Sequence, residues 1–250
     1  MNAVREVWGQ GACVINGWVS SGSPLVAELL SLSGFDSVTV DLQHGFVGMD
    51  GALAMLQAIS HGHSLPMARC ASNDLGQINK LLDAGAEGII CPLVDTAEDC
   101  RRFVEACRYP PAGRRSFGPT RPALLHGAGY FAAANSGIVT LAMIETRQGL
   151  ENVDAILTVA GLDGLFVGPS DLAIALGEEP GAFGRVAVVD DAVRHILARS
   201  KAAGRAAGIF CGSAEQARTM REAGFDLVTP GHDIAFLRSE ATRRIGLIRG

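Results

Sequence analysis

Lysine is scarce in this 250-residue chain: Lys80 and Lys201 are the two lysines, so the other 19 of its 21 basic residues are arginines. Aromatic residues make up only 6% of the sequence, which leaves few side chains on which nucleic-acid bases could stack. The formal net charge of −5 also argues against nucleic acid or an anionic membrane as the main partner. No apolar run approaches the roughly 20 residues that a membrane-spanning helix needs, so we expect no membrane partner.

The six cysteines form no C-x-x-C pair, and most of them lie within apolar stretches. This pattern is typical of buried, reduced thiols and not of a disulfide framework, so we expect a cytoplasmic protein. The first residues, from Met1 to Gly11, include charged residues and glycines but no apolar segment of the kind found in signal peptides. We therefore expect no secretory leader.

Short apolar runs alternate with amphipathic segments along the whole sequence. The runs are rich in Val, Ile, Leu and Phe, as is typical of strands buried on both faces of a parallel sheet. Eight strands that alternate with helices predict one (β/α)₈ barrel, a TIM barrel, over residues 1–250, with a last helix at about 234–249. The candidate strands are Cys13–Val19, Ser37–Asp41, Pro66–Cys70, Gly88–Val94, Ile138–Glu145, Gly164–Gly168, Ala206–Phe210 and Leu227–Thr229.

A weak internal repeat supports the barrel. Four segments begin with glycine, continue with an apolar residue and an acid, and lead into an apolar run. Glycine commonly ends a helix because it accepts the left-handed conformation there, so each segment predicts a helix end followed by a strand. The segments are GFDSV at 34–38, GAEGI at 85–89, GLDGL at 161–165 and GFDLV at 224–228.

Polar and ionisable side chains gather at or directly after the predicted strands. In a barrel of this kind, the carboxyl ends of the strands surround the active site, so this convergence predicts a catalytic mouth. The residues are Asp41, His44, Arg69, Glu145, Asp171, His232 and Asp233. Sites after the eighth strand often bind phosphate, but no phosphate motif is present here, and we interpret the last two residues as pocket wall.

Glu145 and Asp171 follow consecutive predicted strands, the fifth and the sixth. Neighbouring strands lie about 4.8 Å apart, so two carboxylates placed this way can share one hard cation. Either residue alone is more simply interpreted as an ion-pair partner or, for Asp171, as a helix N-cap. The pair favours a divalent-metal site for Mg²⁺ or Mn²⁺, with Co²⁺ as an alternative.

His44 and Arg69 are the candidate groups for proton transfer and charge stabilisation. An imidazole titrates near neutral pH and suits a general base, although His44 alone is more simply a residue that bonds the loop backbone. A fixed guanidinium at Arg69 can hold a carboxylate or an enolate oxygen, or form an ion pair with Asp41. Lys80 and Lys201 both fall in predicted helices away from the mouth, which excludes a lysine imine as the way to stabilise an enolate.

The sequence resembles the HpcH/HpaI aldolases, the metal-dependent pyruvate aldolases that include 4-hydroxy-2-oxoheptanedioate aldolase. The resemblance covers nearly the whole chain, and no single matching segment would identify the family by itself. The matching segments are FDSVTVDLQHG at 35–45, Arg69 with Asn73-Asp74, GAEGIICPLVDTAEDC at 85–100, RYPPAGRRSFG at 108–118, MIETRQGLENVDAI at 143–156 and GLDGLFVGPSDL at 161–172.

The resemblance implies a role for each matching site residue. Glu145 and Asp171 resemble the metal ligands, and Asp171 also belongs to the implied substrate-binding set. His44 resembles the catalytic base. Arg69 resembles the group that binds substrate and stabilises the enolate.

The resemblance further implies a substrate-binding turn and a catalytic acid. Gly168, Pro169 and Ser170 resemble the turn whose backbone N–H groups hold the substrate carboxylate, a use that helix N-termini favour. Asp83 resembles the acid that raises the basicity of the histidine. Because Asp83 falls at the far end of a predicted helix, we expect a neighbouring subunit to supply it. The family implies a homo-oligomer, a hexamer built as a trimer of dimers, with the last helix exchanged between subunits.

Two positions depart from the pattern of the family. Gln43 stands where relatives usually have Glu, and Met143 where many have Gln. The first changes the charge beside the metal site and the second removes a polar contact near the substrate.

Three functions are compatible with these residues. The first is a carbon–carbon lyase that cleaves a 4-hydroxy-2-oxo acid into pyruvate or a related 2-oxo acid and an aldehyde, through an enolate. The second is a CoA-thioester lyase of the malyl-CoA or citrate lyase β type, for which the arginines at 114, 115 and 121 are the candidate phosphate ligands. The third is a barrel that binds 2-oxo acids without catalysis. Retention of the metal ligands, the base and Arg69 favours the first.

Overall fold

The barrel predicted from the alternating pattern is confirmed. A computed structural model describes residues 2–250, which form eight parallel strands and thirteen helices. The strands follow one another in chain order around a closed barrel, and β1 pairs with β8 to close it. Their bounds are β1 Val14–Val19, β2 Ser37–Asp41, β3 Leu65–Arg69, β4 Gly88–Cys91, β5 Val139–Ile144, β6 Gly164–Val167, β7 Ala206–Phe210 and β8 Leu227–Thr229.

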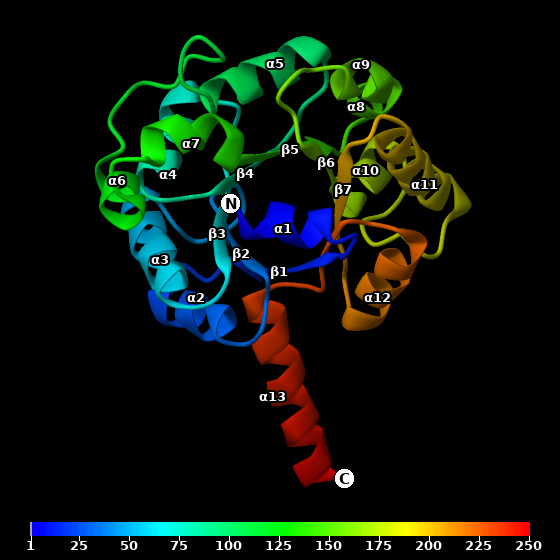
Figure 1. Cartoon of the computed structure of the whole chain (residues 1–250). Helices are drawn as coiled ribbons and strands as arrows, with labels where there is room; N and C mark the ends of the chain where they lie inside the picture. The colour runs from blue at the N-terminus through cyan, green and yellow to red at the C-terminus, as the bar shows by residue number, and fades with distance from the viewer. Residues whose placement is uncertain (1) are drawn as a thin grey trace.

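The helices surround the barrel, except for the first and the last (Figure 1). The thirteen are α1 Ala3–Gly9, α2 Pro24–Ser31, α3 Met49–His61, α4 Leu75–Asp83, α5 Ala97–Ala106, α6 Thr120–His126, α7 Tyr130–Gly137, α8 Arg147–Glu151, α9 Val153–Leu157, α10 Pro169–Ala175, α11 Ala187–Ala202, α12 Ala214–Ala223 and α13 Asp233–Arg249. Within residues 2–250, no helix is long and apolar enough to cross a membrane.

The predicted strands overlap the observed ones, with one large difference in length. The fourth was expected to run from Gly88 to Val94, but β4 ends at Cys91. Pro92 has no N–H to donate to a neighbouring strand, and Leu93 has φ of 54°, outside the extended region. The four glycines that open the repeated segments all have positive φ, between 82° and 105°, as the helix-end interpretation requires.

Two apolar layers hold the barrel together. A large cluster lies between the strands and the surrounding helices, and a smaller one fills the barrel interior. Helix α1 lies across the amino-terminal end of the barrel, where Val4 is fully buried and Trp8 donates a hydrogen bond to the Asp226 carbonyl (Figure 1). With that end covered, the carboxyl ends of the strands are left as the open end.

A polar network occupies the otherwise apolar barrel interior. The Asn16 side chain accepts hydrogen bonds from Ser37 Oγ at 2.8 Å and Thr39 Oγ1 at 3.0 Å, and donates one to Thr229 Oγ1 at 2.9 Å. All four residues are fully buried. Because strands β1, β2 and β8 supply these groups, the network ties together the region where the barrel closes.

Replacing Asn16 with Ala should leave three buried hydroxyl groups without their shared partner. We expect the free energy of unfolding to fall by about 2–3 kcal/mol, measured by urea denaturation. Gln148→Ala, at an exposed position of α8, is the control and should change stability little. Equal stability of the Asn16 variant and the wild type would show that the network does not stabilise the closed barrel.

Candidate active site

A cavity of about 320 Å³ opens at the carboxyl ends of the strands. It brings together most of the site residues predicted from the sequence, which are His44, Arg69, Gly168, Pro169, Ser170 and Asp171. Its remaining wall is largely apolar and includes Trp18, Phe46, Met143, Phe166, Phe210 and Ile234. A small polar ligand in this cavity would therefore meet both charged groups and hydrophobic side chains.

Glu145 lies directly after β5 and is only 3% exposed. Its Oε1 accepts a hydrogen bond from the backbone N–H of Leu93 at 2.9 Å. Its Oε2 is also buried and has no hydrogen-bond partner among the described residues. Burial, with the negative charges of Asp171 and Asp95, raises the pKa of Glu145 to about 7. A buried carboxylate oxygen without a partner is costly, and a cation would remove that cost.

Asp171 lies in the first turn of α10 and is exposed at the cavity. The helix begins at Pro169, with Gly168 as its N-cap residue, so the interpretation of Asp171 as an N-cap is wrong. The side chain is free to face a ligand instead. No cluster of three or more His, Cys, Asp or Glu side chains suited to a metal occurs in residues 2–250. A divalent cation held at this point would have Glu145 and Asp171 as its two carboxylate ligands, with its other positions left to water or substrate oxygens.

Gly168 makes room for the Glu145 side chain. A Cβ atom at position 168 would lie 2.7 Å from Glu145 Oε2 and 3.0 Å from Met143 Cε. The paired strands β5 and β6 bring these residues together, since Ile144 lies opposite Val167 in the sheet. A side chain at position 168 would therefore displace the carboxylate that is the candidate metal ligand.

The first turn of α10 can also bind an anion. Pro169 has no N–H, so the expectation that all three residues of the 168–170 turn donate through their backbones is wrong in this detail. Within α10 the first hydrogen bond runs from the N–H of Leu172 to the carbonyl of Gly168. The N–H groups of Ser170 and Asp171, which precede it, are therefore the ones left to hold a carboxylate at the cavity.

Arg69 and Asp41 form a buried ion pair at the ends of β3 and β2, where the two residues lie opposite each other in the sheet. Arg69 Nε donates to Asp41 Oδ1 at 2.9 Å and Nη2 donates to Oδ2 at 2.7 Å. The guanidinium also lies over the ring of Trp18, 4.9 Å from its centroid. Burial acts to raise the pKa of Asp41, but the hydrogen bonds and charge of Arg69 outweigh it and hold that pKa below its usual value.

This arrangement fixes the orientation of Arg69. Because Nε and Nη2 face Asp41, Nη1 is the nitrogen left to contact a bound ligand. The ion pair that the sequence suggested as an alternative is therefore present, and it is compatible with a role in binding. An Arg held on one edge by a carboxylate and on one face by an aromatic ring keeps the geometry that a planar, charged donor needs.

His44 is exposed at the cavity, on the turn after β2. Its backbone N–H, like that of Gln43, donates to Asp41 Oδ1, so the carboxylate that orients Arg69 also shapes this turn. Gly45 makes the turn tight, since a Cβ there would lie 2.1 Å from the carbonyl oxygen of Asp41. The hydrogen bonds to the backbone leave the imidazole of His44 available for proton transfer.

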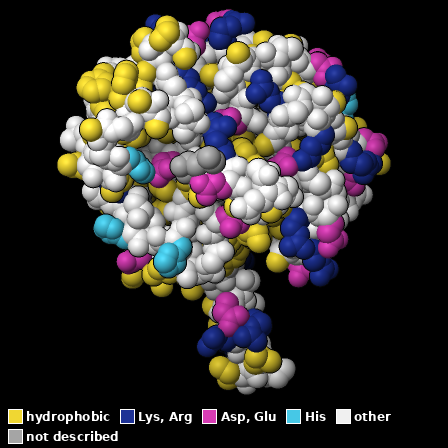
Figure 2. Space-filling model, in the orientation of Figure 1, with side chains coloured by type: hydrophobic (Ala, Val, Ile, Leu, Met, Phe, Trp, Pro, Cys, Tyr) yellow, Lys and Arg dark blue, Asp and Glu magenta, His cyan; other side chains and the backbone are white. Residues whose placement is uncertain are grey.

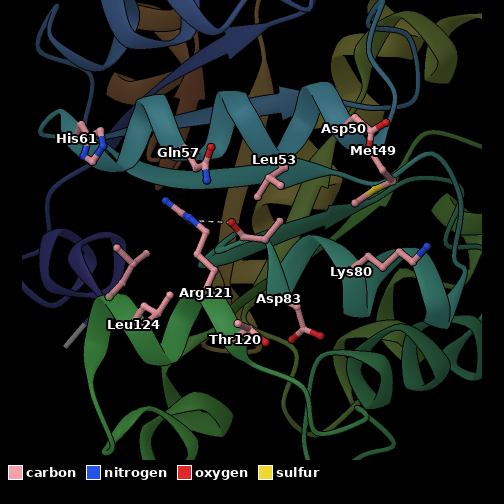
Figure 3. A pocket seen from close by; sticks show the side chains of 12 residues that line it. Met49, Asp50, Leu53, Gln57, His61, Lys80, Asp83, Thr120, Arg121 and Leu124 are labelled. Carbon is pink, nitrogen blue, oxygen red and sulfur yellow. Dashed lines mark hydrogen bonds between the residues drawn. The ribbon is translucent and has the colours of Figure 1, made fainter.

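Asp83 does not join the cavity. It lies at the C-terminal end of α4 and accepts a hydrogen bond from Arg115 Nη2 at 2.8 Å. Its side chain borders a different groove on the outside of the barrel, together with Leu53 and Leu124 (Figure 3). The catalytic role of Asp83 thus stays a prediction that needs a neighbouring subunit.

Sequence reasoning missed several residues that complete the site. Leu93 holds Glu145 through its backbone in a left-handed conformation, and Trp18 supports Arg69. The signal for Leu93 was the proline before it, which ends a strand. Met143, one of the two departures, lines the cavity beside Gly168 and makes this part of the floor apolar.

The chain resembles known proteins over nearly all of its length. A model of the family described as HpcH/HpaI aldolase/citrate lyase matches residues 15–239. A hydroxypyruvate/pyruvate aldolase from Rhizorhabdus wittichii is 45% identical over 245 residues, which cover 98% of this chain and 97% of that relative. A 5-keto-4-deoxy-D-glucarate aldolase from Citrobacter koseri is 37% identical over 230 residues, 91% of this chain and 88% of that relative. The crystal structure of an HpcH/HpaI aldolase/citrate lyase family protein from Burkholderia cenocepacia superposes with a TM-score of 0.93 at 30% identity, over 100% of both chains.

Replacing Gly168 with Ala should weaken binding of a divalent cation without unfolding the barrel, because the new Cβ pushes Glu145 away from its place. We expect the affinity for Mn²⁺, measured by isothermal titration calorimetry, to fall by about tenfold or more. Gly137→Ala is the matched control, since a Cβ at that position meets no atom within 4 Å among the described residues. Unchanged Mn²⁺ affinity in the Gly168 variant would contradict the placement of the metal site.

Proposed function

We propose that this chain, which belongs to the HpcH/HpaI aldolase/citrate lyase family, cleaves a 4-hydroxy-2-oxo acid reversibly into pyruvate or a related 2-oxo acid and an aldehyde. The observation that carries the proposal is the buried, unpartnered Oε2 of Glu145 beside the carboxylate of Asp171. Relatives named hydroxypyruvate/pyruvate aldolase and 5-keto-4-deoxy-D-glucarate aldolase, at 45% and 37% identity, support the same class of reaction.

Glu145 and Asp171 would hold the divalent cation, Mg²⁺ or Mn²⁺. When bound there, such an ion acts as a Lewis acid on the carbonyl of a 2-oxo acid. The N–H groups of Ser170 and Asp171 then bind the carboxylate of the substrate. Nη1 of Arg69 contacts the oxygen on which negative charge develops, and Asp41 holds the guanidinium in place.

His44 is the group that moves protons. In the cleavage direction it takes the proton of the 4-hydroxyl, the bond between C3 and C4 breaks, and the aldehyde leaves. The electron pair of that bond passes toward the keto oxygen and forms an enolate. Return of the proton to C3 completes the 2-oxo acid, so protons and electrons balance without an oxidant. The apolar wall, which includes Trp18 and Phe166, keeps water away from the enolate.

A CoA-thioester lyase fits the structure less well. The arginines that could bind the CoA phosphates lie away from the mouth. Arg115 is buried and paired with Asp83 and Tyr130, and Arg121 donates to the Ala84 carbonyl beside the outer groove (Figure 3). None of these arginines is among the residues that line the cavity. The oxo-acid reaction therefore remains the better proposal.

Release of pyruvate from a 4-hydroxy-2-oxo acid should require a divalent cation. Treatment with EDTA should abolish the reaction, and Mg²⁺ or Mn²⁺ should restore it. Glu145→Gln keeps the shape of the side chain but removes a charged ligand, and should abolish turnover in the presence of metal. A coupled assay that follows pyruvate measures both effects.

Glu151→Gln, an exposed substitution on α8, is the control for Glu145→Gln and should leave turnover unchanged. Borohydride added with pyruvate should also leave the enzyme active. Turnover that is indifferent to chelators, or covalent trapping of pyruvate on Lys80 or Lys201, would rule out the proposed reaction. A Glu145→Gln variant with full turnover would do the same for the proposed metal ligands.

We also propose that α13 is exchanged between subunits of a homo-oligomer. The helix projects away from the barrel as an isolated arm, with hydrophobic side chains near its end (Figures 1 and 2). Within residues 233–249, Asp233 is the one buried residue, while Leu247 is 72% and Ile248 is 84% exposed. An isolated helix with exposed apolar side chains gains little stability by itself, so the arm needs a surface to cover.

The barrel has an apolar face that matches this need. On α2 and at its C-cap, Leu25, Leu29 and Leu32 are 64%, 56% and 56% exposed and lie on one side of the helix, at spacings of four and three residues. In Figure 1, α2 is drawn beside the start of α13, and the ring of Phe35, just after α2, lies 6.5 Å from that of Phe236 on α13, centroid to centroid. The α13 helix of a second subunit would cover this face. The same proposal includes a hexamer, in which Asp83 of one subunit lies near His44 of another.

Replacing Leu247 with Asp should disrupt the assembly, because a charge would be buried where α13 packs on a partner. We expect the wild type to sediment as an oligomer and this variant as a smaller species in analytical ultracentrifugation. Leu29→Asp, on the proposed receiving face, should act in the same way, whereas Thr242→Asp on α13 should not. A monomeric wild type, or an oligomer that tolerates both leucine substitutions, would contradict the exchange.

A further inference from the structure

His232 is a polar side chain without an assigned role, on the otherwise largely apolar wall of the active-site cavity. It follows β8 and immediately precedes α13. Its side chain is 36% exposed, and its ring lies 6.5 Å from the ring of Phe210, centroid to centroid. The proposed reaction assigns it no role, although it borders the same cavity as the charged groups.

The position of His232 is set by its neighbour Asp233, which is nearly fully buried. Asp233 accepts hydrogen bonds from the backbone N–H groups of Ser20 at 2.9 Å and Ser21 at 3.1 Å, so it ties the start of α13 to the loop after β1. The Nδ1 atom of His232 is buried, 3.8 Å from Asp233 Oδ1, and has no hydrogen-bond partner in the part of the chain that the structure describes. The exposed part of the ring is therefore the edge that carries Nε2.

The order of the strands separates His232 from the proposed metal ligands. Glu145 and Asp171 follow β5 and β6, whereas His232 follows β8, which is separated from β6 by β7 and pairs with β1. A 2-oxo acid held by the two carboxylates and by the first turn of α10 occupies one end of the cavity. The aldehyde, which joins or leaves at the far carbon of the oxo acid, extends toward the other end. Phe210, His232 and Ile234 line the wall that its substituents would meet there.

The charges at this end favour a hydroxyl group over a carboxylate. A carboxylate on the aldehyde would lie near the buried negative charge of Asp233 and would need a protonated imidazole to offset it. A hydroxyl can donate or accept a hydrogen bond, so it matches Nε2 of a neutral imidazole in either tautomer. The apolar neighbours Phe210 and Ile234 offer no competing polar contact.

We infer that His232 selects the aldehyde partner, through a hydrogen bond from its Nε2 edge to a hydroxyl group next to the aldehyde carbonyl. The inference rests on the proposed aldolase reaction and adds to it the chemical class of the second substrate, a short hydroxyaldehyde. His232 acts in this account as a specificity-determining residue, and the proton transfers remain with His44.

The test compares wild type, His232→Leu and His232→Gln in two assays. The first follows exchange of the methyl protons of pyruvate with deuterium oxide by NMR, in the presence of Mg²⁺ and the absence of aldehyde. The second measures kcat/KM in the synthesis direction for hydroxyacetaldehyde and for propanal. Exchange should be the same in all three proteins, because it does not involve the aldehyde.

His232→Leu should lower the preference for hydroxyacetaldehyde over propanal by about three- to tenfold, the value of one lost hydrogen bond. His232→Gln places an amide near the position of Nε2 and should keep most of the preference. His195→Leu, on the exposed face of α11, is the matched control and should change neither assay.

Two outcomes would overturn the inference and leave the proposed reaction intact. In the first, His232→Leu keeps the wild-type preference for hydroxyacetaldehyde over propanal and exchanges the pyruvate protons normally. In the second, His232→Leu lowers kcat/KM equally for both aldehydes, which would make His232 a packing residue. If the wild type with metal present does not exchange the methyl protons of pyruvate, the proposed function is wrong, and so is the selection of the aldehyde by His232.

Discussion

The burial of Glu145 beside a second acid is the constraint on which the site depends. One oxygen of this carboxylate is held by the Leu93 N–H and the other is buried with no partner among residues 2–250. A buried charge in this state lowers the stability of a protein unless something compensates it, and a raised pKa is the usual sign of that cost. In the proposed function, a cation and substrate oxygens bound at the open carboxyl ends of the strands would supply the missing contacts.

The residues around Glu145 leave space for its side chain or donate a hydrogen bond to it. Gly168 leaves space for it, and the strained Leu93 turn aims a donor at it, which is the kind of local strain that clusters at functional sites. On the opposite strands, Asp41 neutralises Arg69 and fixes which of its nitrogens faces the cavity. In the proposed function, one part of the mouth would hold an anionic oxo acid with a cation, and the apolar remainder, with His232, would receive an uncharged partner.

Sequence analysis predicted the barrel and most of the mouth because both depend on local patterns. Buried strands are short apolar runs, and the residue types that end them can be read directly. The predicted β4 was too long because Pro92 has no N–H to donate to a neighbouring strand and Leu93 leaves the extended region. The N-cap interpretation of Asp171 was wrong because α10 begins at Pro169. The partnerless oxygen of Glu145 and the direction of α13 could not be predicted, since both depend on side chains and surfaces that meet only in three dimensions. The role of Asp83 depends on a second subunit in the same way.

Anomalous diffraction from crystals grown with Mn²⁺ and pyruvate would test the central claim most directly. The account predicts one manganese peak within coordination distance of both Glu145 Oε2 and Asp171, with pyruvate completing the coordination shell. A manganese ion bound elsewhere, or the two carboxylates turned away from each other in the presence of metal and pyruvate, would contradict it.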